Sequence, residues 1–408
     1  MTKKTDTPAI RFKGFSDTWE QRKLGEVGET YTGLSGKSKD DFGHGSGKFI
    51  TYMNVFSNPV ASPNMTEAIE IDDSQNKVRF GDVLFTTSSE TPAEVGMSSV
   101  WLENAENTYL NSFCFGYRPT AEFNPYYLAY MLRSSSMRKK IIFLAQGISR
   151  YNISKNKMMD IEMPIPSIDE QKQIGEYFAN LDRLITLHQR KYEKLHNIKK
   201  SMLEKMFPKN GSNVPEIRFK GFTEAWEQRK LGELGTITTG NTPSTSIPDY
   251  YSDDGIVWVT PTDICENITF ESARKLSDLG QQVGRVVPKN TILVTCIASI
   301  GKNTMLGNTG SFNQQINGLT PNENKYDPYF LLTESALWSA KMKGSAASGT
   351  MQIVNRTEFS ELKTWLPSLI EQQAIGAFFK QLDNLITLHQ RELYKYLRYR
   401  ILKVRRKS

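Results

Sequence analysis

Two short runs of residues come close to a motif that supports chemistry. Asn124-Pro-Tyr-Tyr127 and Asp327-Pro-Tyr-Phe330 are similar to the Asn/Asp-Pro-Pro-Tyr/Phe motif of enzymes that methylate amino groups. Each run lacks the second proline, and no glycine-rich cofactor turn follows a predicted strand upstream at a suitable spacing. An Asn or Asp followed by Pro is also a common start of a helix, because the side chain caps free N–H groups and proline fits the first turn. Both runs are therefore interpreted as helix starts.

The other residue types that could serve catalysis or metal binding form no recognisable constellation. The segment from Gly43 to Lys48 is one residue shorter than a phosphate-binding loop and continues with Phe49 instead of Ser or Thr. The four histidines lack metal-ligand spacing, the three cysteines lack a CxxC pair, and no catalytic triad or carboxylate pair stands out. We therefore predict that the chain is not an enzyme and holds no metal or cofactor of its own.

The length and charge of the chain predict several folded domains and one basic end. The 408 residues, 38% of them hydrophobic, suggest two or three domains with buried cores. Lys and Arg number 51 against 44 Asp and Glu, and most of the excess lies in residues 368–408. Net charge alone does not identify a nucleic-acid-binding protein. Unpaired cysteines, and the lack of a long apolar run or apolar leader, predict a cytoplasmic protein without membrane contact.

An internal repeat is the strongest signal in the sequence. A leader at residues 8–33 returns at residues 215–240 with 18 of 26 positions identical. The segments that follow the two leaders, 34–150 and 241–350, have little in common. The chain therefore alternates variable and constant segments, and the same leader opens each variable segment.

A second repeated block, which begins at Ser167 and again at Ser368, predicts a long helix in both copies. Each serine forms a capping box with the glutamate three residues on, Glu170 or Glu371. Apolar residues follow at alternating steps of four and three, the spacing of a coiled-coil seam, and the first helix is expected to run to Phe207. Because the two stripes match, they are suited to bury each other. The seam residues are Ile174, Phe178, Leu181, Ile185 and His188 in the first copy, and Ile375, Phe379, Leu382, Ile386 and His389 in the second.

The variable segments are predicted to form mixed α/β domains, because short β-rich runs alternate with Gly, Ser and Asn turns. The expected boundaries place one domain at residues 1–166, a central helix at 167–207, a second domain at 208–367 and a distal helix at 368–408.

This layout resembles the specificity (S) subunit of type I restriction-modification systems. The resemblance rests on the seven residues from Trp19 and again from Trp226, and on a proline-led Glu-Gln pair at Glu170 and at Glu371. It covers essentially the whole chain. The resemblance implies an α+β fold class, in which two mixed α/β target recognition domains have a pseudo-two-fold arrangement. Two long helices forming an antiparallel coiled coil would separate them.

The same resemblance implies a function and a set of partners. Each recognition domain would read one half of a bipartite double-stranded DNA target, and the helices would dock two modification (methyltransferase) subunits. Restriction (motor-nuclease) subunits would join them to cut unmodified DNA. S-adenosylmethionine, ATP and Mg would be bound by those partner subunits, so the chain itself would be non-catalytic.

Residues that contact bases are expected among the polar side chains on loops, because Arg and Lys read guanine and Asn and Gln read adenine. The candidates in the first domain are Ser35, Lys37, Lys39, Thr86, Thr87, Ser88, Ser89, Ser149, Arg150 and Asn152. Those in the second domain are Asn241, Thr242, Ser244, Ser299, Lys302, Asn313, Gln314, Gln315, Gln352, Asn355 and Arg356. Arg138, Lys139 and Lys140 are expected to contact phosphates or to form a solvated helix face.

Two other functions stay open at the level of sequence. A self-contained DNA methyltransferase or nuclease is the main alternative, and the missing cofactor motif argues against it. A coiled-coil scaffold that does not bind DNA is the other, but it fails to explain why the variable segments diverge while their frames match.

Overall fold

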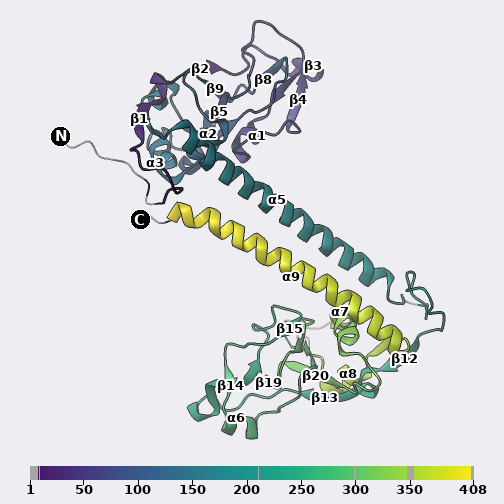
Figure 1. The fold of residues 1–408 in the computed structure, drawn as a ribbon. Coiled ribbons are helices and arrows are strands. Elements are labelled where there is room, and N and C mark those ends of the chain that lie inside the picture. Colours follow the sequence, from purple (N-terminus) through teal and green to yellow (C-terminus); the bar gives the residue numbers. More distant parts are fainter. Residues whose placement is uncertain (1–7, 9, 210, 298–299, 347–352, 406–408) are drawn as a thin grey trace. The chain divides into compact units, whose positions relative to one another are not determined.

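The computed structural model describes residues 8, 10–209, 211–297, 300–346 and 353–405. The chain divides into two compact units, residues 1–187 with 393–408 and residues 188–392. Each unit contains one mixed α/β domain and part of each of two long helices, α5 (Ile168–Lys205) and α9 (Leu369–Arg405) (Figure 1). Within the described ranges, no helix has the length and apolar character needed to cross a membrane.

The first domain contains two main sheets. One has the strand order β2-β9-β5-β7 and the other the order β4-β3-β8, while β1 pairs antiparallel with β11 where the chain enters and leaves the domain. The elements are β1 (Glu20–Lys23), β2 (Gly28–Thr32), β3 (Phe42–Ile50), α1 (Tyr52–Ser57), β4 (Thr66–Ile69), β5 (Val83–Thr86), β6 (Ser88–Ser89), β7 (Ser98–Val100), β8 (Thr108–Leu110), β9 (Cys114–Pro119), α2 (Pro125–Met131), α3 (Ser135–Phe143), β10 (Tyr151–Asn152), α4 (Lys155–Met159) and β11 (Glu162–Ile165).

The second domain has the same plan although its sequence differs. Its sheets have the orders β13-β20-β17-β18-β15 and β16-β14-β19, and β12 pairs with β21 at the entry and exit of the chain. The elements are β12 (Glu227–Lys230), β13 (Gly235–Thr239), β14 (Tyr251–Val259), β15 (Ile268–Thr269), β16 (Lys275–Leu276), α6 (Asp278–Val283), β17 (Ile292–Thr295), β18 (Asn303–Leu306), β19 (Gly310–Phe312), β20 (Ile316–Pro321), α7 (Pro328–Ala346), α8 (Arg356–Glu361) and β21 (Lys363–Leu366).

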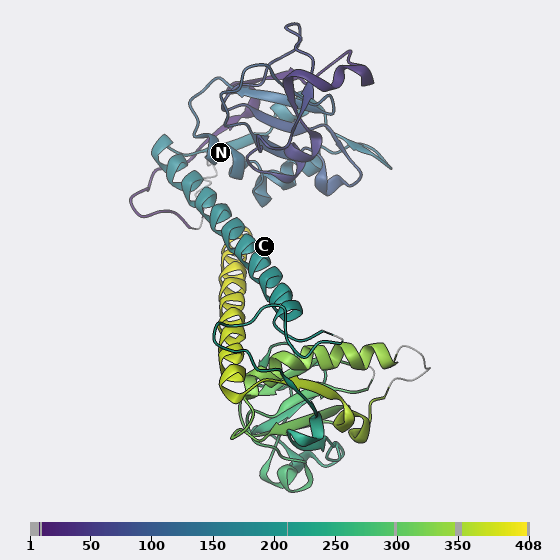
Figure 2. The same ribbon diagram turned by 90° about the vertical axis from the view of Figure 1, so that its right-hand side faces the viewer.

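In each domain, one strand of the main sheet packs apolar side chains on both faces of that sheet. Successive side chains of a strand point to opposite faces of the sheet. Val83 and Phe85 of β5 pack in the cluster that contains Leu128 of α2, whereas Leu84 between them packs with Trp101 on the other face. β17 alternates in the same way between two clusters of the second domain, and α7 packs against β17 and β18 (Figure 2). Each domain is therefore layered as helices, main sheet and small sheet.

The repeated leader fastens each domain to the long helix that follows it. Arg11 donates two hydrogen bonds to the buried carboxylate of Glu170, at 2.8 and 2.6 Å, and Trp19 donates a third at 2.9 Å. Arg218 donates two bonds of 2.7 Å to Glu371 in the second copy. Ser167 and Ser368 accept from the glutamate N–H groups as predicted. A capping box also predicts a second hydrogen bond, from the serine N–H to the glutamate side chain. That part of the prediction is wrong in both copies, because both glutamate side chains bind arginine instead.

Contacts between α5 and α9 show that the two helices pair antiparallel. In the second unit, His188 lies beside His389 with 3.0 Å between Nδ1 atoms, and Lys199 pairs with Asp383 at 2.6 Å. The residue number rises along α5 while that of its partner falls along α9. In the first unit, Asp182 pairs with Arg400 at 3.2 Å. Positions 182 and 383, and positions 199 and 400, correspond in the repeat, so each helix supplies the same acidic and basic positions to the pair. These contacts confirm the predicted fold class.

Six of the ten predicted seam residues are buried, His188 and His389 are half-buried, and the seam also packs on the first domain. Leu181, Ile185, Ile375, Phe379, Leu382 and Ile386 are buried, whereas Ile174 and Phe178 are only partly buried. Ile174 packs against the core of the first domain, and the Phe178 ring lies 5.4 Å from that of Tyr130 in the same domain. The apolar stripe therefore joins domain to helix as well as helix to helix.

The predicted end of the first helix at Phe207 is wrong by two residues. α5 ends at Lys205, and Phe207 is buried against Trp226 of the second leader and Phe330 of α7. Phe207 therefore belongs to the core of the second domain and not to the helix.

Candidate nucleic-acid interface

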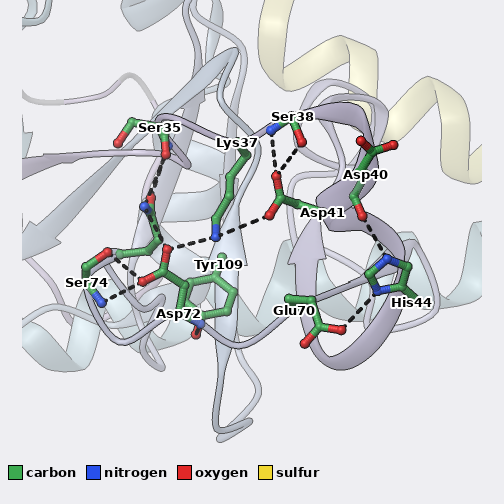
Figure 3. A network of polar contacts seen from close by, with 11 residues as sticks. Ser35, Lys37, Ser38, Asp40, Asp41, His44, Glu70, Asp72, Ser74 and Tyr109 are labelled. Atoms are coloured by element: carbon green, nitrogen blue, oxygen red, sulfur yellow. Dashed lines mark hydrogen bonds and ion pairs between the residues drawn. The ribbon is translucent and has the colours of Figure 1, made fainter.

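Two of the first-domain candidates, Ser35 and Lys37, lie in a network of polar contacts (Figure 3). Lys37 forms an ion pair with Asp72 at 2.8 Å and lies 3.9 Å from Asp41. The hydrogen bond to Asp72 raises the pKa of Lys37, and the same bond lowers the pKa of Asp72. The ammonium group is thus already neutralised by carboxylates. Lys39, in a short 3-10 turn, is exposed to solvent.

Ser35 belongs to the same network through its backbone. Its N–H donates to the side-chain oxygen of Gln75 at 3.0 Å, and its carbonyl accepts from the Gln75 amide at 3.1 Å. Its side chain is exposed. Ser35 and Lys39 therefore remain accessible to a ligand, whereas Lys37 mainly holds this loop in place.

The prediction that residues Thr86 to Ser89 form an exposed loop is wrong. Thr86 is the last residue of β5 and is fully buried, and Ser88 and Ser89 form β6 and are also buried. The Thr86 hydroxyl accepts from the N–H of Met97 at 3.0 Å. Thr87 is half-buried and donates its hydroxyl to the Phe113 carbonyl at 2.8 Å. The hydroxyl groups of Thr86 and Thr87 are used to hold neighbouring chain segments.

A second group of first-domain candidates is exposed beside β6. Asn152 lies in β10, which pairs antiparallel with β6, and Ser149 and Arg150 lie in the preceding turn with exposed side chains. The structure thus brings two separate sequence candidates together at one edge. Arg150 is an exposed cation in this turn.

The candidates of the second domain gather around residues 313–315. The Thr242 hydroxyl donates to the side-chain oxygen of Gln314, and Asn313 donates to that of Gln315 at 3.1 Å. Gln314 is exposed and Gln315 is half-buried, but Asn313 is buried. Asn241 is half-buried, and its side chain bonds the backbone of residues 283 and 285. Asn313 and Asn241 therefore act as structural supports, and the prediction that they are free loop residues is wrong.

The remaining second-domain candidates have different surroundings. Ser244 is exposed and its hydroxyl bonds that of Ser246 at 2.7 Å, and Lys302 is exposed with its ammonium 3.1 Å from a backbone carbonyl. Asn355 caps α8, and Arg356 follows it with an exposed side chain. Ser299 and Gln352 lie outside the described residues.

The guanidinium group of Arg138 is bonded within the first domain and does not form part of a solvated basic face. It donates to the carbonyl groups of Ala93, Val95 and Gly96 at 2.6–3.0 Å. Burial lowers its pKa. The expectation that Arg138 contacts phosphate or forms a solvated face is wrong, because its guanidinium holds the loop between β6 and β7.

The backbone hydrogen bonds around Thr87 in the first domain have equivalents around Cys296 in the second domain. Thr87 N–H donates to the Phe113 carbonyl at 3.0 Å, and Ile153 N–H donates to the Thr87 carbonyl at 3.0 Å. In the second domain, Cys296 takes the place of Thr87, with bonds of 2.8 Å to the Gln315 carbonyl and 2.9 Å from Val354 N–H. Gln315 therefore corresponds to Phe113.

This correspondence identifies a first-domain loop that sequence reasoning missed. Residues 111–113, between β8 and β9, occupy the place of residues 313–315, between β19 and β20. The two segments read Asn-Ser-Phe and Asn-Gln-Gln, and the sequence signal that they share is the pattern Asn-x4-Gly-x2-Pro, which runs from Asn111 to Pro119 and again from Asn313 to Pro321. We call residues 111–113 and 313–315 the tip loops.

The two domains thus share one topology, and each has an edge with exposed polar side chains and is bonded to a long helix. The family model for the type I restriction modification DNA specificity domain matches residues 16–197 and 223–397. The chain belongs to this family. It is the non-catalytic subunit that recognises a bipartite DNA sequence, one half with each domain.

Comparisons with individual relatives support the same family assignment. The putative type I restriction enzyme MjaX specificity subunit of Methanocaldococcus jannaschii is 23% identical over 394 residues, which cover 92% of this chain and 89% of that protein. The HindI specificity subunit of Haemophilus influenzae is 28% identical over 171 residues, 40% of this chain and 37% of that one. The crystal structure of the type I S subunit from M. genitalium has the same fold, with a TM-score of 0.64, 14% identity and 98% coverage of both chains.

Proposed function

We propose that the target recognition domains are residues 1–166 and 208–367, and that they contact DNA through the edges described above. The observation that carries the proposal is the matched hydrogen-bond pattern of Thr87 and Cys296, which gives two unlike sequences the same edge. Exposed cations lie in both regions, among them Arg150 in the first domain, and Lys302 and Arg356 in the second. Such side chains bind phosphate and position a protein on the duplex, while amides and hydroxyls read bases.

The constant segments are proposed to bind the other subunits. Residues 167–207 and 368–408 would dock two modification subunits, and restriction subunits would join that assembly. A pocket of about 490 Å³ in the second unit supports this assignment. The second leader, which includes Arg218, lines it together with the start of α9, and both of these segments are repeated in the chain. A surface that is built from repeated sequence suits a partner that must bind twice.

S-adenosylmethionine, ATP and Mg²⁺ would be bound by those partners, in the cytoplasm. The chemistry of methyl transfer and DNA cleavage would then lie outside this chain, whose part is to hold the target in register.

The direct test is a methylation assay with S-adenosylmethionine and genomic DNA. The purified chain alone should give no methylated adenine, and the chain assembled with its modification subunits should methylate one bipartite sequence. Methylation or cleavage of DNA by the chain alone would support the alternative, a self-contained methyltransferase or nuclease.

A further inference from the structure

The two tip loops are held by the same backbone supports. The Asn111 side-chain oxygen accepts the N–H of Phe113 at 2.8 Å, and its carbonyl accepts the N–H of Cys114 at 3.0 Å. In the second domain, Asn313 accepts from Gln315 at 3.1 Å and from Ile316 at 3.2 Å. The asparagine of each tip loop therefore fixes the backbone and leaves the next two positions to vary.

The end of each constant leader packs directly against a tip loop. The leader ends at Gly33 in the first copy and at Gly240 in the second. A Cβ atom at either glycine would lie 2.2 Å from the carbonyl oxygen of Asn111 or Asn313, far inside van der Waals contact. Only glycine allows the tip loop to pack this closely. A repeated element thus carries a loop whose side chains differ between the domains.

The varying side chains are available to a ligand and differ in chemistry. Ser112 and Phe113 are exposed in the first domain, Phe113 to 56%, and Gln314 is exposed in the second. An exposed Phe can contact the thymine methyl group, Ser can bond several base edges, and Gln can bond adenine. Both amide oxygens of Gln314 and Gln315 already accept a hydrogen bond from within the domain. Those bonds orient the amides, whose NH₂ groups can donate to acceptors such as purine N7.

We infer that the tip loops are base-reading elements, with Ser112 and Phe113 reading one half of the target and Gln314 and Gln315 reading the other. A fixed backbone with interchangeable exposed side chains is what readout of different sequences requires, because base contacts need defined geometry. This inference rests on the proposed function of the two domains. It goes further by placing part of the sequence preference at two equivalent pairs of positions.

The test uses the full chain assembled with its modification subunits, on a DNA library in which both half-sites are randomised. Methylated molecules are sequenced for the parent chain and for Gln314→Ala, Gln315→Ala and Phe113→Ala. The Gln variants should lower discrimination about 5- to 100-fold at one or two positions of one half. Phe113→Ala should act only in the other half. Gln314→Glu should move the preference toward cytosine, whose N4 donates to a carboxylate.

Asn308→Ala is the matched control, because this exposed amide precedes β19 and so lies at the far end of that strand from the tip loop. It should keep the parent preference. Gln variants that keep the parent preference, or that weaken all sequences equally, would overturn the inference, as would Gln and Phe113 variants that alter the same half. If the parent complex shows no bipartite preference, the proposed function itself fails.

Discussion

The bond between the second leader and α9 gives a quantitative prediction about stability. The carboxylate of Glu371 is 1% exposed and accepts two hydrogen bonds of 2.7 Å from Arg218. Arg218→Ala would leave this carboxylate buried and without its cation. Breaking a buried ion pair by removing one partner destabilises a protein by about 3–5 kcal/mol, because the remaining charge is uncompensated. For a unit of about 200 residues, about 3 kcal/mol corresponds to a fall in Tm of about 6–12 °C.

The assay is differential scanning calorimetry of the full chain. The transition of the second unit should move to lower temperature, while that of the first unit, which has its own bond between Arg11 and Glu170, should stay in place. Arg229→Ala is the matched control. Arg229 pairs with Glu227 at 2.8 Å, but both side chains are at least half exposed, so its loss should leave the Tm unchanged.

A double variant separates the charge from the packing. Arg218→Met with Glu371→Leu removes both charges and keeps apolar bulk, and it should recover most of the stability lost in Arg218→Ala. The reasoning would be refuted if Arg218→Ala melted like Arg229→Ala, or if the double variant were as unstable as the single one.

Three further outcomes follow from single features of the structure. Burial raises the pKa of Glu334 to about 7, above the value of 4.5 for an unfolded chain, so the neutral carboxyl favours the folded state; its contribution to stability, about 3 kcal/mol, should be complete below pH 4.5 and be lost as the pH rises through 7. Glu334→Gln should flatten this pH dependence in urea titrations. Lys39→Gln should lower the slope of log affinity against log salt by about 1, whereas Lys37→Gln, which removes a cation already paired, should leave the slope unchanged in fluorescence binding assays. Four residues inserted between positions 187 and 188 of α5 add ~6 Å and should widen the gap between half-sites by about one to two base pairs without changing either half, as read from methylated sequences.

The repeat made much of the architecture predictable. Matching leaders and matching helix blocks predicted two domains and two long helices, and the seam positions from Leu181 to Ile185 are buried as expected. Asn124 and Asp327 cap helices as their sequence predicted, with bonds of 3.1 and 2.8 Å to backbone N–H groups. These features are local or periodic, so that a few neighbouring residues determine them.

The candidate site was less predictable because its geometry depends on residues distant in sequence. Lys37 is paired with Asp72, and Arg138 with carbonyl groups more than 40 positions away, and neither partnership leaves a pattern in the sequence. Thr86 looks like a loop residue among serines and threonines, but it ends the central strand of the sheet. Asn111 and Asn313 are recognised as counterparts by their hydrogen bonds, because the sequence pattern that they share, a Gly and a Pro at the same spacing, is short.

The central claim is that each domain reads its own half of one DNA target, and an exchange of domains tests it most directly. β12 and β21 pair where the chain enters and leaves the second domain, with Lys230 opposite Lys363, so residues 231–362 can be replaced by the matching segment of another specificity subunit at that neck. Methylated adenines are then mapped across a genome for the parent and the exchanged chain, each with its modification subunits. The account predicts that one half of the recognised sequence changes and the other half stays the same. A change in both halves, or in neither, would contradict it.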